Sequence, residues 1–201
     1  MTAIIDYDAG NIKSVENALR TLGEEVIVTR DADQLLKASR VILPGVGAFG
    51  DAMDQLNAFG LCDVIRRIAD NGTPFLGICL GMQLLFESSE ESPGVRGLSL
   101  LRGRIRRFPE KKDLKIPHIG WNDLRFPVRK RLFHDIPQSS YVYFVHSYFL
   151  HADDPTIVSA QALYGLMFDA GIEKDNLFAC QFHPEKSADV GMRILENFLS
   201  V

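Results

Sequence analysis

Pro74-Phe-Leu-Gly-Ile-Cys-Leu-Gly81 contains a short buried strand, a tight turn and the first residues of a helix. Its second half, Gly77-Ile-Cys79-Leu-Gly81, has the G-x-nucleophile-x-G pattern of a nucleophile elbow, with cysteine in place of serine. A nucleophile at such a turn has a strained backbone, and small neighbours relieve the crowding around it. Open α/β sheets place ligands outside the carboxyl ends of their strands. The stretch therefore predicts an α/β fold that presents Cys79 at this edge of the sheet.

The segments around this stretch alternate between strand and helix. Apolar runs predict strands at 2–6, 25–29, 41–43 and 74–78. Helical spacing of apolar residues predicts helices at 12–22, at 31–38 with Asp31 as N-cap, over 53–68 with a break near Gly60, and from 82 to 87. This order predicts a mostly parallel, doubly wound sheet with helices on both faces.

The second half of the chain is richer in β structure. The best strand candidates are 116–121, 141–150, 156–160 and 177–182. A closing helix is expected over 187–199, with Ser187 as a plausible N-cap. No internal repeat, low-complexity tract or linker interrupts the chain, so we expect one domain over residues 1–201.

Composition excludes several classes of protein. Hydrophobic residues make up 46% and charged residues 24% of the 201 residues, as in ordinary globular proteins, and the formal net charge is −4. Neither disorder nor nucleic-acid binding fits these values. The basic segment that begins at Arg102 and ends at Lys115 is interpreted as a solvated face.

Location and cofactors can be predicted from the same features. The N-terminus lacks the pattern of a signal peptide, and no apolar run is long enough to cross a bilayer. Three widely separated cysteines without an export signal indicate reduced thiols in the cytoplasm. No Cys or His spacing suits zinc, and we expect neither a metal nor another cofactor.

Cys79 is the candidate nucleophile. At a strand-to-helix turn its thiolate would be stabilised by the helix dipole and by free N–H groups. The N–H of Leu80 would point at the oxyanion that forms when the sulfur attacks a carbonyl. Taken alone, the pattern is equally compatible with a buried structural cysteine. Cys62 and Cys180 are interpreted as such core residues.

His183-Pro184-Glu185 supplies the remaining parts of a triad. In an extended chain residues i and i+2 share a face, so His183 and Glu185 are expected to point the same way. Pro184 biases His183 toward that extended geometry. A carboxylate that holds one imidazole nitrogen leaves the other free to take the cysteine proton. By itself His-Pro-Glu is usually a surface turn, but beside an elbow cysteine it predicts a general base and its orienting acid.

Three motifs together resemble the class I glutamine amidotransferase family. They are Gly77-Ile-Cys-Leu-Gly-Met-Gln83, Phe182-His-Pro-Glu-Lys186 and the loop Pro44-Gly-Val-Gly47, which matches the family's oxyanion loop. Within the family, His118-Ile-Gly-Trp-Asn122 and Tyr143-Phe-Val-His-Ser-Tyr148 most resemble the glutaminase subunits of imidazole glycerol phosphate synthase. The resemblance implies the family's α/β fold and an enzyme that hydrolyses L-glutamine through a cysteine thioester.

The resemblance also implies roles for further residues. The oxyanion hole would consist of Val46, Gly47 and Leu80. Glutamine would be held by Gly47, Gln83, Glu91, Ser147 and Tyr148, the last two partly through their backbone. Glu91 could instead be a solvated member of an acidic loop. His146 is expected to be a core histidine, and His118, His134 and His151 structural or exposed.

A partner is implied because a glutaminase alone would waste glutamine. The resemblance indicates a cyclase with a (β/α)₈ barrel, in a heterodimer that makes imidazole glycerol phosphate and an aminoimidazole carboxamide ribonucleotide. Candidate contacts to this partner or to the ammonia passage are Asn11, Trp121, Asn122 and Lys186, although Trp121 could equally be buried. Three alternatives stay open: a glutaminase of another synthase, such as the anthranilate or guanylate type, a cysteine hydrolase of similar fold, and an inactive regulatory subunit.

Overall fold

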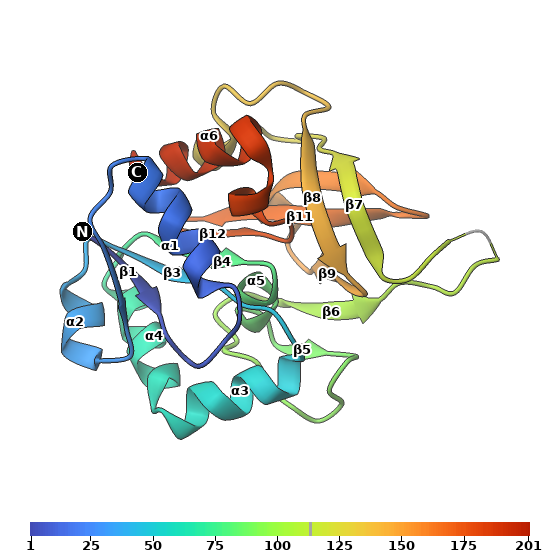
Figure 1. The fold of residues 1–201 in the computed structure, drawn as a ribbon. Helices are drawn as coiled ribbons and strands as arrows, with labels where there is room; N and C mark the ends of the chain where they lie inside the picture. The colour runs from blue at the N-terminus through green and yellow to red at the C-terminus, as the bar shows by residue number, and fades with distance from the viewer. Residues whose placement is uncertain (113) are drawn as a thin grey trace.

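The amino-terminal half forms the parallel part of a large sheet. The computed structural model describes residues 1–112 and 114–201. Four strands alternate with helices along the chain: β1 (Thr2–Ile5), β2 (Val26–Thr29), β3 (Arg40–Leu43) and β4 (Phe75–Ile78). With β12 (Leu177–Cys180) they pair in parallel in the order β2-β1-β3-β4-β12. The predicted α/β architecture is confirmed, and the carboxyl ends of β1, β3, β4 and β12 lie along one edge (Figure 1).

Helices cover both faces of this sheet. One face carries α1 (Ile12–Thr21) and α6 (Ala188–Leu199), and the other carries α2 (Ala32–Lys37), α3 (Phe49–Ala58) and α4 (Leu61–Asp70) (Figure 1). Alternate strand residues serve the two faces: Ala3 and Ile5 pack in one buried cluster, whereas Ile4 packs in the other. This is the two-sided burial expected for parallel strands.

Local chemistry explains where two of these helices begin and end. The Asp31 side chain accepts a hydrogen bond from the Gln34 amide at 2.8 Å, which confirms it as the N-cap of α2. Gly60 adopts a φ of 67° between α3 and α4, so the predicted break in the long helical stretch is also confirmed. None of the helices in the described residues has the length and apolar character needed to cross a membrane.

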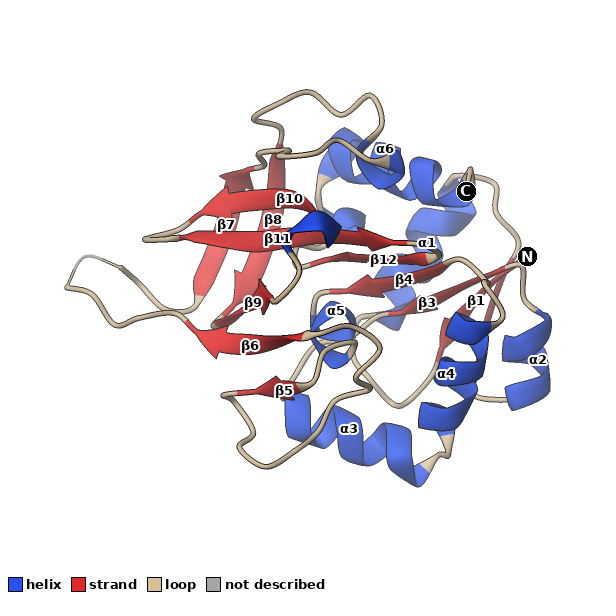
Figure 2. Ribbon diagram, turned by 180° about the vertical axis from the view of Figure 1, so that it is seen from behind, coloured by secondary structure: helices blue, strands red, loops and turns tan. Residues whose placement is uncertain are grey.

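The second half extends the sheet with antiparallel strands. Beyond β12 the order continues through β11 (Met167–Lys174), β9 (Tyr148–Ala152), β6 (Gly103–Arg107) and the short β5 (Ser88–Ser89), while β10 (Val158–Leu163) pairs with β11 (Figure 2). The sequence did not predict β6 or β11. In β6 the exposed Arg104 and Arg106 alternate with buried Gly103 and Ile105, so the basic segment is solvated on one side only.

A separate hairpin stands beside the main sheet. It consists of β7 (His118–Asp123) and β8 (Tyr141–His146), which pair with each other in antiparallel register. The single strand predicted over 141–150 is therefore wrong: it is divided at Ser147, and its two parts belong to different sheets. Three short 3₁₀ turns complete the described elements: η1 (Arg131–Phe133), η2 (Pro155–Ile157) and η3 (Pro184–Lys186).

Candidate active site

Cys79 lies at the tight turn between β4 and the short helix α5 (Leu80–Leu84). Its φ of 54° and ψ of −108° are rarely adopted by a side-chain-bearing residue, as a nucleophile elbow requires. The Cys79 amide donates to the Cys180 carbonyl at 2.8 Å, so the neighbouring strand β12 holds the turn in place.

The two glycines of the elbow are required by close backbone contacts. A Cβ added to Gly77 would lie 2.8 Å from the Gly81 carbonyl oxygen, and one added to Gly81 would overlap the Leu43 carbonyl oxygen. The close approach of α5 to β3 and β4 thus depends on both glycines. This agrees with the steric reason for which the sequence singled them out.

His183 and Glu185 meet directly behind this turn. The Nδ1 atom of His183 lies 2.7 Å from Glu185 Oε1, and both side chains are buried. The extended geometry predicted for His183 is confirmed, with φ −100° and ψ 97°, but the extended chain does not continue to Glu185. Strand β12 ends at Cys180, and Pro184 starts the 3₁₀ turn η3 that carries Glu185, because proline favours the first position of such a turn.

The environment of His183 favours its charged form. Burial alone would lower the pKa of His183, but interactions with Cys79 and Glu185 raise it to about 10. Its Nε2 atom is buried and forms no hydrogen bond to the residues that the structure describes. The imidazole therefore has one nitrogen fixed by a carboxylate and the other unpaired, and it is coupled to the Cys79 thiol.

Two further residues support this pair. The Asn11 side chain donates to Glu185 Oε1 at 2.5 Å, which places Asn11 against the carboxylate. Ser187 is not the side-chain cap predicted for α6. Its hydroxyl donates to the His183 carbonyl at 2.6 Å and accepts from the Tyr143 amide at 3.0 Å. The Ser187 hydroxyl thus links η3 to β8 and is not available to cap α6. Lys186, in η3, is exposed.

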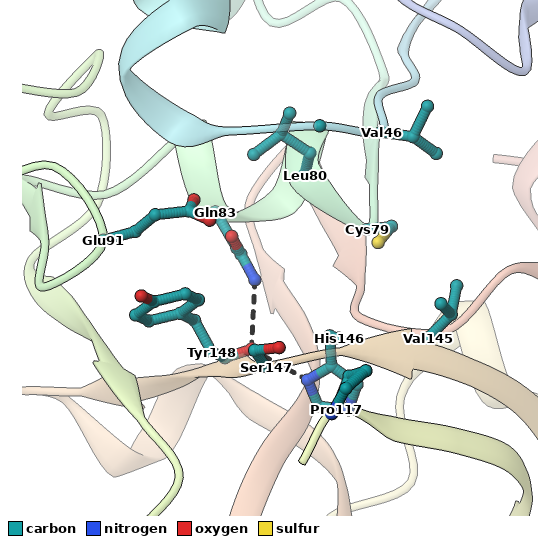
Figure 3. Close-up of a pocket in the computed structure, with 11 residues that line it drawn as sticks. Val46, Cys79, Leu80, Gln83, Glu91, Pro117, Val145, His146, Ser147 and Tyr148 are labelled. Atoms are coloured by element: carbon teal, nitrogen blue, oxygen red, sulfur yellow. Dashed lines mark hydrogen bonds between the residues drawn. The ribbon is translucent and has the colours of Figure 1, made fainter.

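A pocket of about 310 Å³ opens above Cys79. Such a volume suits a small ligand of the size of an amino acid. Every residue predicted for the oxyanion hole or for glutamine binding lines it, as Figure 3 shows for the labelled side chains. The remaining lining residues, Pro117, Val145 and His146, were not predicted to face a ligand; they precede or end the hairpin strands, which sequence patterns do not place beside α5.

Gln83 has only an acceptor left for a ligand. Its Nε2 donates to the Tyr148 carbonyl at 3.2 Å and to Gln181 Oε1 at 3.0 Å, which uses both of its N–H groups. The Tyr148 carbonyl also accepts from His146 Nδ1 at 2.8 Å, so both of its lone pairs are occupied. Tyr148 can therefore offer a ligand its ring or amide, but not its carbonyl.

Glu91 is neither free nor fully solvated. Its Oε2 accepts a hydrogen bond from the Phe49 amide at 2.8 Å, so the carboxylate caps the amino end of α3 while facing the pocket (Figure 3). Ser147 has its carbonyl occupied by the Phe108 amide at 3.1 Å. On this side of the pocket Gln83 and Glu91 both present acceptor oxygens, which suits an ammonium group.

The donors of the candidate oxyanion hole line the same pocket. Leu80 is the first residue of α5, and its N–H has no partner within the helix. The Val46 and Gly47 loop follows β3 and lines the same pocket. Gly47 has a φ of 111°, a conformation that only glycine adopts easily.

The other histidines divide into a buried pair and an exposed pair. His118 and His146 are buried and lie 3.0 Å apart between Nδ1 and Nε2, and burial lowers their pKa values to about 4 and about 3. The prediction that His146 is a core histidine is confirmed, although one side of it also lines the pocket. His134 and His151 are exposed.

Two of the four candidate partner contacts, Trp121 and Asn122, lie on the hairpin, whereas Asn11 precedes α1 and Lys186 lies in η3. Trp121 is 53% exposed, so the alternative of a buried tryptophan is wrong. Asn122 donates to the Leu163 carbonyl at 3.0 Å and lies 3.4 Å from His118 Nε2. It is partly buried, and both contacts are within the chain.

Comparison with known proteins agrees with this geometry. The model of the family described as glutamine amidotransferase class-I matches residues 3–201. The chain is 50% identical over 196 residues to the imidazole glycerol phosphate synthase subunit HisH of Moorella thermoacetica, with 98% of this chain and 92% of the relative covered. The subunit of the same name from Methanocaldococcus jannaschii is 46% identical over 201 residues, with both chains fully covered.

Solved structures support the fold. The crystal structure of a glutamine amidotransferase aligns with a TM-score of 0.77 over 98% of this chain and 97% of the other. Its sequence is 20% identical, so the likeness concerns the fold alone. It extends over the parallel strands and the β-rich half together.

Proposed function

Because the chain belongs to the class-I glutamine amidotransferase family, and within it to the HisH subunits of imidazole glycerol phosphate synthase, we propose that it hydrolyses L-glutamine for a synthase. Cys79 is the nucleophile, His183 the general base and acid, and Glu185 the residue that orients His183. The observation that carries this proposal is the buried imidazole of His183: Glu185 holds its Nδ1, its Nε2 has no hydrogen-bond partner among the described residues, and interactions with Cys79 and Glu185 raise its pKa.

The first half of the reaction releases ammonia. The Cys79 thiolate attacks the side-chain amide carbon of glutamine, so a C–S bond forms and the carbonyl electron pair moves onto oxygen. The amides of Leu80 and of the Val46–Gly47 segment would bind this oxyanion. His183 then donates its proton to the amide nitrogen, the C–N bond breaks, and ammonia leaves with a glutamyl thioester on Cys79.

The second half regenerates the enzyme. A water molecule loses its proton to His183 and attacks the thioester carbon. The C–S bond then breaks, which releases glutamate and returns Cys79 to the thiolate. Throughout, Glu185 keeps the imidazole in one orientation and stabilises its charged form.

The pocket accounts for the choice of an amino-acid amide. The acceptor oxygens of Gln83 and Glu91 suit the α-ammonium group of glutamine, while the thiol and the amide donors line the same pocket. Ser147 and Tyr148 complete the wall of the pocket and would contact the α-carboxylate through donors.

The ammonia is used by a partner subunit. The relatives are named as subunits of a synthase, and we infer that this chain pairs with a cyclase subunit that has a (β/α)₈ barrel. That cyclase would add the ammonia to a phosphorylated ribonucleotide and yield imidazole glycerol phosphate and an aminoimidazole carboxamide ribonucleotide. The exposed Trp121, with Asn11, Asn122 and Lys186 around the same edge, is the proposed contact surface and ammonia passage.

The decisive experiment separates the glutaminase from the synthase. Cys79→Ala should abolish glutamine hydrolysis, while the complex with its partner should still make product from added ammonium. Cys62→Ala is the matched control, because Cys62 is buried in α4 away from the pocket, and it should keep glutaminase activity. Full glutamine turnover by Cys79→Ala would refute the mechanism. Failure to co-elute with the cyclase, together with binding to an anthranilate- or guanylate-type synthase, would assign the chain to another pathway.

A further inference from the structure

A buried amide outside the proposed triad faces the sulfur of Cys79. Gln181 follows β12, and its side chain is fully buried. Its Nε2 lies 3.7 Å from Cys79 Sγ, a donor distance suited to the large sulfur atom. Its backbone amide donates to the Ala170 carbonyl of β11 at 2.9 Å, so the sheet holds the backbone of this residue in place.

The contacts of Gln83 determine which end of the Gln181 amide faces the sulfur. The Gln83 atom that lies 3.2 Å from the Tyr148 carbonyl must be its nitrogen, because two oxygens would repel each other. The same nitrogen lies 3.0 Å from the Gln181 side chain, so the atom there must be the acceptor Oε1. The remaining end of the Gln181 amide, directed at Cys79, is therefore the NH₂ group.

The histidine pair fixes the other side of this chain of hydrogen bonds. His146 Nδ1 must carry a proton to donate to the Tyr148 carbonyl, and its Nε2 is then an acceptor for His118 Nδ1. His118 Nε2 is left to face the Asn122 amide nitrogen at 3.4 Å. Burial keeps both rings neutral, with pKa values lowered to about 4 and about 3. The donor and the acceptor of each hydrogen bond from His118 through His146, Tyr148 and Gln83 to Gln181 are thereby assigned.

We propose that Gln181 is a positioning residue of the nucleophile, which donates a side-chain N–H to the Cys79 sulfur and so stabilises the thiolate in its buried position. The proposal rests on Cys79 being the nucleophile of the glutaminase. An amide suits this task because it has no titratable proton, so it supports the thiolate without competing with His183 for the proton. Cys79 is only 6% exposed, so water reaches the sulfur from the pocket side alone and the amide replaces part of the lost solvation.

Other titratable groups interact electrostatically with Cys79 or with its partner His183. Tyr7 lies beyond the end of β1, Cys180 ends β12, and His183 and Glu185 belong to the turn after β12. Substitution of Gln181 leaves all four in place. A change in the ionisation of Cys79 in Gln181 variants can therefore be assigned to the amide.

The test uses alkylation of Cys79 by iodoacetamide, followed across pH by mass spectrometry of the Cys79 peptide. Gln181→Met removes the donor at nearly constant volume, and Gln181→Glu replaces the N–H with an oxygen while keeping an acceptor for Gln83. We expect the midpoint of the pH profile to rise by about one pH unit in Gln181→Met, the size of a charge-assisted hydrogen bond, and further in Gln181→Glu. Glutamine turnover should fall mainly in kcat and recover as the pH is raised.

The matched control is Gln161→Met, which removes a side-chain hydrogen bond to Asp169 in the β-rich half, outside the lining of the Cys79 pocket. Its alkylation profile should overlay that of the unmodified chain. Identical profiles for Gln181→Met, Gln181→Glu and the control would overturn the proposal. If alkylation of Cys79 left glutamine hydrolysis intact, the proposed function itself would fail, so the two failures are distinguishable.

A measurement on the unsubstituted chain covers variants that do not fold. The side-chain amide resonances of Gln181 in an ¹⁵N-labelled sample should shift as Cys79 ionises, and this shift should vanish in Cys79→Ala. Resonances that stay constant through the Cys79 titration would also overturn the proposal.

Discussion

At the scale of single residues, the site depends on strain that the surrounding strands hold in place. Cys79 keeps a φ of 54° because its amide is bonded to Cys180 and because Gly77 and Gly81 let α5 lie against β3 and β4. A residue with a Cβ in this region is disfavoured by about 1–3 kcal/mol. The position of the sulfur is thus obtained at the expense of stability.

This strain predicts an ordering of two inactive variants. Cys79→Gly and Cys79→Ala both lose the thiol, but only glycine adopts the required backbone conformation without strain. After subtraction of the entropic penalty of glycine, we expect the free energy of unfolding of the Gly variant to exceed that of the Ala variant by about 1 kcal/mol. Urea denaturation of the two proteins measures this. An Ala variant as stable as the Gly variant would show that the turn is unstrained.

The roles of His183 and Glu185 predict unequal losses of activity. His183→Asn should lower kcat by about 10² to 10⁴-fold, since thiolate formation and protonation of the leaving nitrogen both require the imidazole. Glu185→Gln should lower it less, because the carboxylate orients and stabilises the ring but does not itself transfer the proton. Steady-state glutamine hydrolysis tests both. If His183→Asn had only a mild effect and His146→Asn abolished activity, the assignment of His183 as the general base would be wrong.

The buried pair His118 and His146 predicts how stability depends on pH. Their pKa values in the folded chain lie near 4 and 3, below the unfolded value of about 6.5, so the unfolded chain binds protons first as the pH falls. The free energy of unfolding should therefore decrease from pH 6.5 downward, by about 2 kcal/mol for each histidine between pH 6.5 and 5. His183 has a smaller effect of opposite sign in this window: it stays protonated in the folded chain, whereas the unfolded chain gains about half a proton between pH 6.5 and 5.

Denaturation curves at several pH values measure this slope. His146→Gln should make the dependence shallower, whereas substitution of the exposed His134 should leave it unchanged. A slope that His146→Gln does not alter would mean that the buried ring titrates normally.

Sequence patterns locate residues whose chemistry depends on local spacing. Cys79 with its glycines and the His-x-Glu pair are recognisable because their partners lie within four positions along the chain. The contacts of Gln181, Asn11 and Ser187 at the site were not predicted, although the sequence indicates Asn11 as a partner contact and Ser187 as an N-cap, because each acts on an atom that only the fold brings close. Asn11, for example, reaches Glu185 across 174 positions of sequence.

At the scale of elements, prediction succeeded for the parallel strands and was incomplete in the antiparallel part, where β6 and β11 were missed and β8 and β9 were merged into one strand. The strands β1, β3 and β4 are almost uniformly apolar because both of their faces are buried. β11 contains Asp169, Gly171 and Glu173, and β6 contains three arginines, so neither has the composition of a typical strand. Their polar residues are satisfied by partners remote in sequence, as when Glu173 bonds to Arg131 at 2.7 Å.

The hairpin of β7 and β8 contacts the turn that carries the proposed base on one side and exposes large apolar side chains on the other. The His183 amide donates to the Tyr143 carbonyl at 3.0 Å, and Ser187 accepts from the Tyr143 amide, so β8 braces the turn that carries Glu185. Across the register Trp121 faces Tyr143, and Ile119, Trp121 and Tyr141 are each more than half exposed. Large apolar side chains so exposed beside an active site indicate an interaction surface.

Trp121 is the proposed anchor of this surface. Trp121→Ala should weaken binding of the cyclase by about 30-fold, the effect of losing roughly 2 kcal/mol at an interface hot spot. Stability of the isolated chain should change little, since half of the ring already faces solvent. Calorimetric titration and thermal unfolding measure the two quantities. The exposed Val28, in the edge strand β2 at the other end of the main sheet, offers a matched control in Val28→Ala.

A loss of stability as large as the loss of binding would contradict this assignment. It would show that Trp121 holds the hairpin together rather than contacting the partner.

At the scale of the whole molecule, the site is assembled at the carboxyl edge of the parallel strands. Asn11 follows β1, the Val46 loop follows β3, Cys79 follows β4, and His183 follows β12. Because these strands are neighbours in the order β1-β3-β4-β12, the segments that carry these residues meet at one edge of the sheet (Figure 1). Residues of β8 and β9 line the pocket on the side away from the parallel strands. The hairpin that carries the proposed partner surface therefore also forms part of the pocket wall.

The oxyanion loop is fixed at its start and free further along. The Tyr7 hydroxyl donates to the Pro44 carbonyl at 2.8 Å, and burial raises the pKa of this hydroxyl, so it stays a donor. A Cβ on Gly45 would overlap the same hydroxyl, so the chain cannot shift there. Gly47, in contrast, has open space around it, and Val46 is 38% exposed. We therefore expect any rotation of this loop to occur at the peptide units around Val46 and Gly47.

This confinement predicts that the partner controls glutamine hydrolysis. An oxyanion hole needs a second donor besides the Leu80 amide, and the Val46–Gly47 segment can supply it only when its N–H points inward. Lack of one such donor lowers the rate by about 10² to 10³-fold. Docking of the cyclase beside the exposed Val46, and a nucleotide bound to the cyclase, should favour the inward conformer and raise kcat by this factor. The measurement is glutamine turnover by the chain alone, with the cyclase, and with the cyclase and its nucleotide. Equal kcat values in the three conditions would mean that the hole is formed in the isolated chain and that glutamine is hydrolysed whether or not the ammonia can be used.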